Sequence, residues 1–220
     1  MSTATGARSG PGELLADRAY VELRDQIVTL ALPPGAPINE EALGRELDLG
    51  RTPIREAIKR LALENLVCVY PRRGTFVSEI NITDLAHISD VRVELEGRAA
   101  YRAAQRLTPS HREELEALVE EIAQRGANGA ADALMRLDAR IHRFVYRCAG
   151  NPYLRDTLER YLNLSLRIWY LVLGRLPHLF ERVHEHGELL QAIREGEADR
   201  ARAIAADHVA TFEREIRGLL

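Results

Sequence analysis

The fold of the N-terminal part is decided by one stretch of sequence, Gly50-Arg51-Thr52-Pro53-Ile54-Arg55-Glu56-Ala57-Ile58-Lys59-Arg60-Leu61. It predicts a helix with a basic first turn and an apolar far face. Thr52 suits the N-cap of this helix and Pro53 its first position. Arg51 and Arg55 would then lie at the positive end of the helix dipole, where cations are disfavoured. An anionic partner is therefore expected, and a DNA phosphate or a guanine edge would supply one.

The composition is that of an ordinary globular protein, and only the distribution of charge is unusual. The 220 residues are 46% hydrophobic and 29% charged, with a net charge of -3, and they suffice for one large or two small domains. Residues 51–73, however, hold six basic residues against two acidic ones. A solvated helix face explains such a cluster as well as a DNA-binding patch does.

Nothing in the sequence indicates export or a membrane. Two distant cysteines, Cys68 and Cys148, form neither a disulfide framework nor a CxxC metal pair. Residues 1–12 lack the apolar core of a signal peptide and are expected to be disordered. No apolar stretch approaches the ~20 residues of a membrane span. We therefore expect a cytoplasmic protein without a membrane partner.

Residues 13–80 predict a winged helix-turn-helix domain. Helices are expected over 13–32, 40–47 and 52–65, from apolar residues at helical spacing and from the Pro-Gly break after the first of them. A turn over 48–51 would join the last two helices. Two β-rich segments, 67–70 and 75–77, flank a basic turn and predict a hairpin.

Three motifs of this domain resemble those of the GntR family of bacterial transcription regulators. They are Leu32-Pro33-Pro34-Gly35-Ala36-Pro37-Ile38-Asn39-Glu40, Arg51-Thr52-Pro53-Ile54-Arg55-Glu56-Ala57 and Pro71-Arg72-Arg73-Gly74-Thr75-Phe76-Val77. The resemblance covers residues ~15–80 and implies that helix 52–65 reads double-stranded operator DNA in the major groove, while the hairpin contacts the adjacent groove or backbone. The DNA-binding residues that it implies are Arg45, Gly50, Arg51, Thr52, Arg55, Lys59, Arg72, Arg73 and Gly74.

The chain departs from the family pattern at four positions. Ala31 and Asn65 each stand where the family usually has Gly, and Asp48 and Gly50 where it has Gly and Ser. Gly50 lacks a hydroxyl that could contact a phosphate or a base. The fold expectation is unaffected, but the operator sequence is expected to differ.

Residues 81–220 predict an all-α domain of six helices. Helices are expected from Thr83 to Leu107 and from Thr108 to Arg125, with a break over 126–129. A third helix would end at Ala149. The last three are expected to begin at Asn151-Pro152, at Pro177 and after Gly196. The whole chain is therefore expected to be mainly α, with a C-terminal helical bundle.

Four polar residues fall on predicted apolar helix faces of this bundle: Asp138, His142, His186 and His208. Burying them unpaired would be costly, and a shared divalent cation would remove the cost. Asp138 and His142 lie one helical turn apart and can chelate one ion. Spacing alone favours the simpler interpretation, in which these are hydrogen-bonded core residues or an ion pair.

The same residues resemble an FCD effector-binding domain, the type found at the C-terminus of FadR. The resemblance is carried by Asp138 and His142, the run Ala149-Gly150-Asn151-Pro152, His186 with Leu189-Leu190-Gln191-Ala192-Ile193, and His208-Val209. Many such domains bind a metal, and the resemblance implies that Asp138, His142, His186 and His208 are the ligands. Zn²⁺ is the first expectation, with Ni²⁺ or Mn²⁺ as alternatives. The other histidines are expected to have no ligand role, with His184 on the surface.

Arg92 is expected in the same interior, at the centre of an inward stripe formed by Leu85, Ile88, Leu95 and Ala99. A buried guanidinium needs a partner, and a carboxylate is the natural one. That carboxylate could belong to a small organic or sugar acid, or to Glu96 one turn later. Arg167 is a second candidate for contact with the same effector.

These features favour a ligand-responsive transcription regulator. One DNA-binding module binds too weakly for genomic specificity, so a homodimer on a pseudo-palindromic operator is expected. An effector bound near the metal would shift the population of dimer geometries. A metal-dependent enzyme and a helical assembly module are the alternatives, although the sequence has no nucleophile motif.

Overall fold

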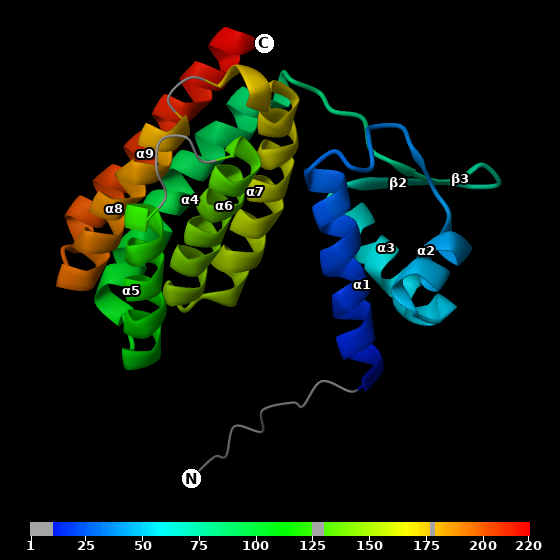
Figure 1. Ribbon diagram of the computed structural model, residues 1–220, viewed down its shortest axis with the longest axis horizontal. Coiled ribbons are helices and arrows are strands. Elements are labelled where there is room, and N and C mark those ends of the chain that lie inside the picture. Colours follow the sequence, from blue (N-terminus) through cyan, green and yellow to red (C-terminus); the bar gives the residue numbers. More distant parts are fainter. Residues whose placement is uncertain (1–10, 125–129, 177–178) are drawn as a thin grey trace. The chain divides into compact units, whose positions relative to one another are not determined.

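The computed structural model describes residues 11–124, 130–176 and 179–220, and it divides the chain into two compact units (Figure 1). The first unit comprises residues 1–80 and the second residues 81–220. Disorder was predicted for residues 1–12, but the first helix already begins at Pro11. Residues 1–10 lie outside the described part of the chain. None of the described helices is long and apolar enough to cross a membrane.

Three helices form the core of the first unit: α1 (Pro11–Val28), α2 (Glu40–Leu47) and α3 (Arg51–Leu63). The apolar residues at helical spacing are buried, with Leu23 and Ile27 of α1 and Ile58 and Leu61 of α3 almost inaccessible to solvent. Helix α1 packs against α3. Helix α2 has the predicted bounds because Asn39 caps it, accepting hydrogen bonds from the backbone of the first turn.

A small antiparallel sheet completes the first unit. Strands β2 (Val67–Tyr70) and β3 (Gly74–Val77) form the predicted hairpin, and β1 (Pro37–Ile38) adds a third strand in the order β1-β3-β2. Figure 1 shows the hairpin projecting beyond the helices. The sequence did not predict β1, because two residues are too few to establish an alternating pattern. The winged helix-turn-helix fold is confirmed.

The ends of α3 correct the predicted bounds of 52–65. The N-cap is Gly50 and not Thr52, and no side chain caps the helix, so Pro53 occupies its third position. At the other end, Asn65 adopts a left-handed conformation with φ 63°, and Asp48 between α2 and α3 does so with φ 53°. These are two of the positions where the GntR pattern has Gly. Asn and Asp tolerate this conformation better than other non-glycine residues, which explains why the substitutions preserve the turns.

We expect Asn65→Ala to lower the free energy of unfolding by about 1 kcal/mol, because alanine is strained in the left-handed region. Asn65→Gly should leave stability unchanged or raise it slightly. Urea denaturation followed by circular dichroism measures both. Equal stabilities for the alanine and glycine variants would show that the backbone at this turn relaxes.

The second unit contains six described helices, as predicted. Their bounds are α4 (Asp84–Arg106), α5 (Pro109–Gln124), α6 (Ala131–Cys148), α7 (Pro152–Val172), α8 (Leu179–Glu195) and α9 (Ala198–Leu219). A short 3-10 turn, η1 (Leu173–Arg175), follows α7. Asn151 caps α7 through its side chain. The predicted break at 126–129 and the predicted helix start at Pro177 lie outside the described residues.

Helix α4 organises the bundle, because it packs against α6, α7, α8 and α9 (Figure 1). Its contact with α9 is the most extensive, and Gly97 permits a close approach there: a Cβ at Gly97 would lie 3.3 Å from the Arg202 carbonyl oxygen. The buried faces of α4, α6, α8 and α9 therefore meet around a common interior. The polar residues singled out in the sequence lie in that interior.

Candidate metal centre and DNA-reading helix

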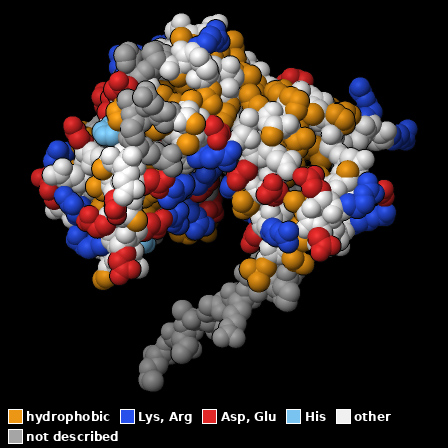
Figure 2. Space-filling model, viewed as in Figure 1, with side chains coloured by type: hydrophobic (Ala, Val, Ile, Leu, Met, Phe, Trp, Pro, Cys, Tyr) orange, Lys and Arg blue, Asp and Glu red, His pale blue; other side chains and the backbone are white. Residues whose placement is uncertain are grey.

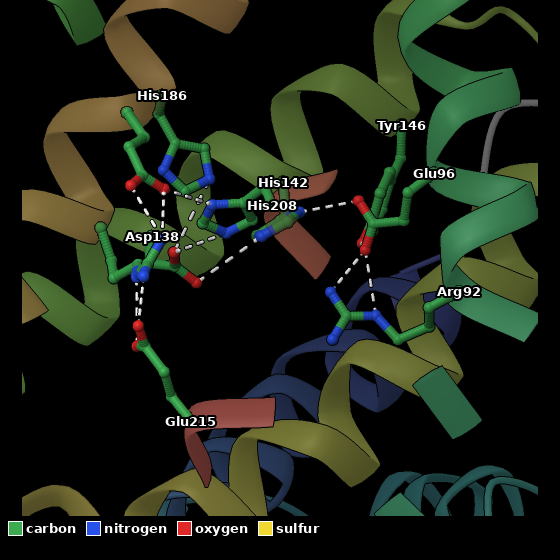
Figure 3. Close-up of polar contacts among 10 residues, drawn as sticks. Arg92, Glu96, Asp138, His142, Tyr146, His186, His208 and Glu215 are labelled. Atoms are coloured by element: carbon green, nitrogen blue, oxygen red, sulfur yellow. Dashed lines mark hydrogen bonds and ion pairs between the residues drawn. The ribbon is translucent and has the colours of Figure 1, made fainter. Parts of the chain in front are cut away.

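Asp138 and three histidines come together in the interior of the second unit (Figure 3). Helix α6 contributes Asp138 and His142, α8 contributes His186, and α9 contributes His208. One potential ligand atom from each of the four lies within 4.8 Å of those from the others. The histidine Nε2 atoms of His142, His186 and His208 lie 3.8, 3.7 and 3.9 Å from an Asp138 carboxylate oxygen.

These distances suit ligands that share an ion. Two ligand atoms each ~2.1 Å from one ion lie about 3.0–4.2 Å apart, depending on the angle between them. The three separations from Asp138 fall in that range and exceed the length of a hydrogen bond. All four side chains are at most 6% exposed. Asp138 Oδ2 and the three Nε2 atoms are buried without a hydrogen-bond partner among the described residues. Such unsatisfied groups are costly unless an ion binds them, so the residues fit a divalent metal.

The protonation state of His186 also suits a metal ligand. Burial lowers the pKa of His186 well below its ordinary value, and repulsion from His208 and His142 lowers it further. The ring is therefore neutral at neutral pH, which is the form that binds a cation.

Arg92 is buried, as predicted, and its carboxylate partner in the structure is Glu96. Arg92 donates hydrogen bonds from Nε and Nη2 to Glu96 Oε1. Tyr146 donates to the same oxygen at 2.7 Å, and Glu96 Oε2 lies 2.8 Å from His142 Nδ1 (Figure 3). Burial raises the pKa of Glu96, but attraction by His142 and Arg92 outweighs this effect and keeps the pKa below its ordinary value.

The contact between Glu96 and His142 was not predicted from the sequence. The two residues are 46 positions apart, and periodicity alone does not reveal which helix faces which. Tyr146 carried a local signal, because it follows His142 by one helical turn and shares its face.

A second acidic residue, Glu185, lies beside the buried cluster, and its own side chain is 44% exposed. Glu185 Oε2 is 3.6 Å from His208 Nδ1, slightly beyond hydrogen-bond length. Arg182 binds Glu185 at 2.8 Å and also pairs with Glu215. Interactions with His208 and Arg182 lower the pKa of Glu185, against the opposing effect of its partial burial.

A series of aromatic contacts also extends from Arg92 to His208 of the cluster. The Arg92 guanidinium lies 5.1 Å from the centre of the Trp169 ring. Trp169 packs edge-on against Phe212 at 4.7 Å, and Phe212 stacks near His208. Arg167, the other predicted effector contact, is buried on α7, two residues before Trp169.

The remaining histidines differ in exposure. His184, two residues before His186, is exposed, as is His87, and His111 is half-buried. His178 lies outside the described residues.

The predicted DNA-binding residues lie on the surface of the first unit. All nine are exposed: Arg45, Gly50, Arg51, Thr52, Arg55, Lys59, Arg72, Arg73 and Gly74. In Figure 2, Lys and Arg side chains gather at the hairpin tip and around α2 and α3, with acidic side chains between them. Arg72 has φ 63° in the hairpin turn, and the Arg73 guanidinium lies 5.8 Å from the Tyr70 ring.

The anionic partners expected for the first turn of α3 are already present within the protein. Arg51 pairs with Glu41 at 2.7 Å, and Arg55 pairs with Glu40 at 2.9 Å. Both glutamates belong to the first turn of α2, where the helix dipole favours acidic residues. The expected anionic partners are therefore supplied within the protein, and the arginine charges alone do not require DNA, although exposed pairs of this kind are weak.

Comparison with known proteins gives the same two-part division. The model described as "Bacterial regulatory proteins, gntR family" matches residues 15–77, and the "FCD domain" model matches residues 87–211. The chain is 24% identical over 207 residues to the Escherichia coli HTH-type transcriptional repressor RspR, covering 94% of this chain and 91% of that protein. It is 28% identical over 188 residues to the E. coli HTH-type transcriptional regulator McbR, covering 84% and 85%.

A solved structure, E. coli McbR/YncC, shares the fold with a TM-score of 0.80 at 24% identity, covering 93% of this chain and 97% of that one. The relatives are transcription regulators and not enzymes, so neither the metal-dependent enzyme nor the simple assembly module is supported. The chain belongs to the GntR family of bacterial transcription regulators, and its C-terminal unit is an FCD domain.

Proposed function

We propose that this regulator binds a pseudo-palindromic operator as a homodimer and senses a small carboxylate through a divalent metal ion. Asp138, His142, His186 and His208 would hold the ion, Arg92 and Arg167 would contact the effector, and α3 with the hairpin would contact DNA. The protein would act in the cytoplasm, where the chromosome lies. The observation that carries the proposal is the set of four buried ligand atoms that have no hydrogen-bond partner in the part of the chain that the structure describes.

The donor set supports Zn²⁺ as the ion, with Ni²⁺ and Mn²⁺ as alternatives. Three imidazole nitrogens and one carboxylate oxygen suit each of them, and geometry and metal supply decide between them in cells. When bound, the ion would supply a fixed positive charge and coordination positions for an oxygen ligand. An ion with five or six ligands would have room for an effector oxygen.

The charge of the buried network supports an anionic effector. Arg92 and Glu96 neutralise each other, and the three histidines are neutral when they act as ligands. Asp138 offsets one of the two charges of the ion, so one positive charge remains. A monocarboxylate would neutralise it, which favours organic or sugar acids over neutral sugars or amines.

Control of DNA binding would follow from linkage. An effector that prefers one dimer geometry shifts the population toward that geometry and changes operator affinity by the same coupling free energy. A two-fold dimer places its reading helices about one helical turn of DNA apart, ~34 Å, and so matches a pseudo-palindromic site.

A thermal-shift screen tests the effector assignment. Zinc-loaded and EDTA-treated protein would be heated with a panel of hydroxy, keto and sugar acids, each paired with its amide. We expect at least one acid, but not its amide, to raise the Tm of the zinc-loaded protein alone. The same acid should change the affinity for DNA from upstream of the chain's own gene. Equal shifts with and without zinc would contradict metal-assisted effector binding.

A further inference from the structure

In the described part of the chain, His142 has a hydrogen-bond partner on one side of its ring only. Its Nδ1 lies 2.8 Å from Glu96 Oε2, while its Nε2 faces Asp138 at 3.8 Å and has no hydrogen-bond partner among the described residues. A neutral imidazole carries one N–H group and one lone pair. An ionised carboxylate only accepts hydrogen bonds, so Glu96 places the hydrogen on Nδ1. The lone pair is then on Nε2, directed toward the cluster.

His208 has a carboxylate on the corresponding side of its ring but no hydrogen bond to it, because its Nδ1 has no hydrogen-bond partner among the described residues. Its Nδ1 lies 3.6 Å from Glu185 Oε2, and its Nε2 lies 3.9 Å from Asp138 Oδ1. Arg182 pairs with both Glu185 and Glu215, and these ion pairs fix the position of Glu185 beside the cluster. The longer distance and the greater exposure of Glu185 predict a weaker effect than that of Glu96.

We propose that Glu96 and Glu185 are positioning residues of the metal centre, each of which fixes the tautomer and orientation of one histidine ligand. This inference rests on the metal site proposed above. Carboxylates that accept the second N–H of a metal-bound histidine hold its ring and make its other nitrogen more basic, and their loss typically costs 10–100-fold in metal affinity.

Glu96 also joins the metal centre to the proposed effector contact. Its Oε1 accepts hydrogen bonds from Arg92 and Tyr146, so that Oε2 remains for His142. Arg92 therefore influences His142 through a single shared carboxylate. An anion that draws Arg92 away from Glu96 changes the support of a metal ligand, so anion and metal binding are coupled through this residue.

The metal affinity of two glutamine variants tests the proposal. Glutamine preserves the size of the side chain but removes the charge that fixes the tautomer. We expect Glu96→Gln to weaken Zn²⁺ binding about 10–100-fold and Glu185→Gln to weaken it less, measured by competition with a chromophoric chelator. The matched control is Glu188→Gln on the same helix as Glu185, an exposed residue that should bind Zn²⁺ like the wild type.

A spectroscopic measurement on metal-free protein separates positioning from folding. The ¹⁵N shifts of the histidine rings should show Nδ1–H forms for His142 and His208 in the wild type. Glu96→Gln should alter the His142 signals and leave those of His208 in place, and Glu185→Gln should do the reverse. Because Glu185 is half-exposed, its variant tests the proposal even if Glu96→Gln fails to fold.

The outcomes distinguish this proposal from the function on which it rests. Wild-type protein that binds none of Zn²⁺, Ni²⁺ and Mn²⁺ would overturn the metal site, whatever the tautomers are. Wild-type protein that binds Zn²⁺ while both glutamine variants match Glu188→Gln in affinity would overturn the positioning role alone. Nε2–H tautomers in the metal-free wild type would also overturn it.

Discussion

His186→Ala is expected to abolish specific metal binding and to remove the stabilisation that the ion provides. His186 is 1% exposed, and its Nε2 lies 3.7 Å from Asp138 Oδ1, so its loss opens one corner of the four-residue cluster. An ion at 1,000 times its Kd stabilises the folded protein by about 4 kcal/mol. For a protein of this size, such a difference corresponds to a Tm change of about 10 °C.

The measurement is the Tm of each protein with excess Zn²⁺ and after treatment with EDTA. The difference between the two values isolates the ion, because the cavity left by the shorter side chain lowers both. We expect a difference of about 10 °C for the wild type and none for His186→Ala. Elemental analysis of protein purified without a His tag should give the corresponding metal contents.

His184→Ala is the matched control. His184 lies two residues earlier on the same helix, is exposed, and contacts Phe180 rather than the cluster. Its replacement removes an imidazole and should leave both the metal content and the response to EDTA unchanged. If the Tm difference between zinc-loaded and EDTA-treated protein were as large for His186→Ala as for His184→Ala, the four residues would not bind the ion and would be ordinary core residues.

The sequence predicted those parts of the structure that depend on local pattern. The winged helix-turn-helix and the six described C-terminal helices follow from apolar spacing, proline positions and turn residues. Asp138 and His142 could be paired because one helical turn separates them. His186 and His208 lie on two other helices; their positions on apolar faces made a shared ion one possibility, and the resemblance to FCD domains made it the favoured one. Their role as ligands stays a prediction.

The parts that could not be predicted depend on contacts between distant segments. Glu96 was considered only as a partner for Arg92, yet it also reaches His142 on another helix. Likewise, the pairing of Glu40 with Arg55 and of Glu41 with Arg51 joins two helices, and no local pattern in the sequence indicates it. The left-handed conformation of Asp48 and Asn65 came from the turns that the fold requires and not from their own preferences.

Arg51→Ala and Arg55→Ala are expected to weaken operator binding about 10–100-fold each, because a bidentate contact with a base is worth about 1–3 kcal/mol. Both side chains are exposed on the first two turns of α3, and their partners are surface carboxylates that contribute little to stability. The variants should therefore unfold at the wild-type temperature. Fluorescence anisotropy with labelled DNA from upstream of the chain's own gene measures the affinity, and a salt titration shows how many phosphate contacts are lost.

A variant with the same loss of charge elsewhere is needed as the control. Arg140→Ala on α6 removes an exposed arginine that pairs with Glu121, and it should leave DNA affinity within about twofold of the wild type. If Arg51→Ala and Arg55→Ala bound DNA as tightly as Arg140→Ala, α3 would not be the reading helix.

Replacing the glutamates of α2 is expected to raise the affinity for DNA, whereas replacing the arginines lowers it. Glu41→Gln and Glu40→Gln remove the carboxylates that pair with Arg51 and Arg55, and they also remove negative charge that would lie near the DNA phosphates. If these arginines bind DNA, both variants should bind more tightly, by several-fold at low salt and less at high salt, where charge is screened. The gain in affinity should extend to DNA of unrelated sequence, because the released arginines strengthen phosphate contacts, which do not depend on base sequence. A loss of affinity would instead mean that the glutamates orient the arginines for reading, and that the ion pairs persist on the DNA.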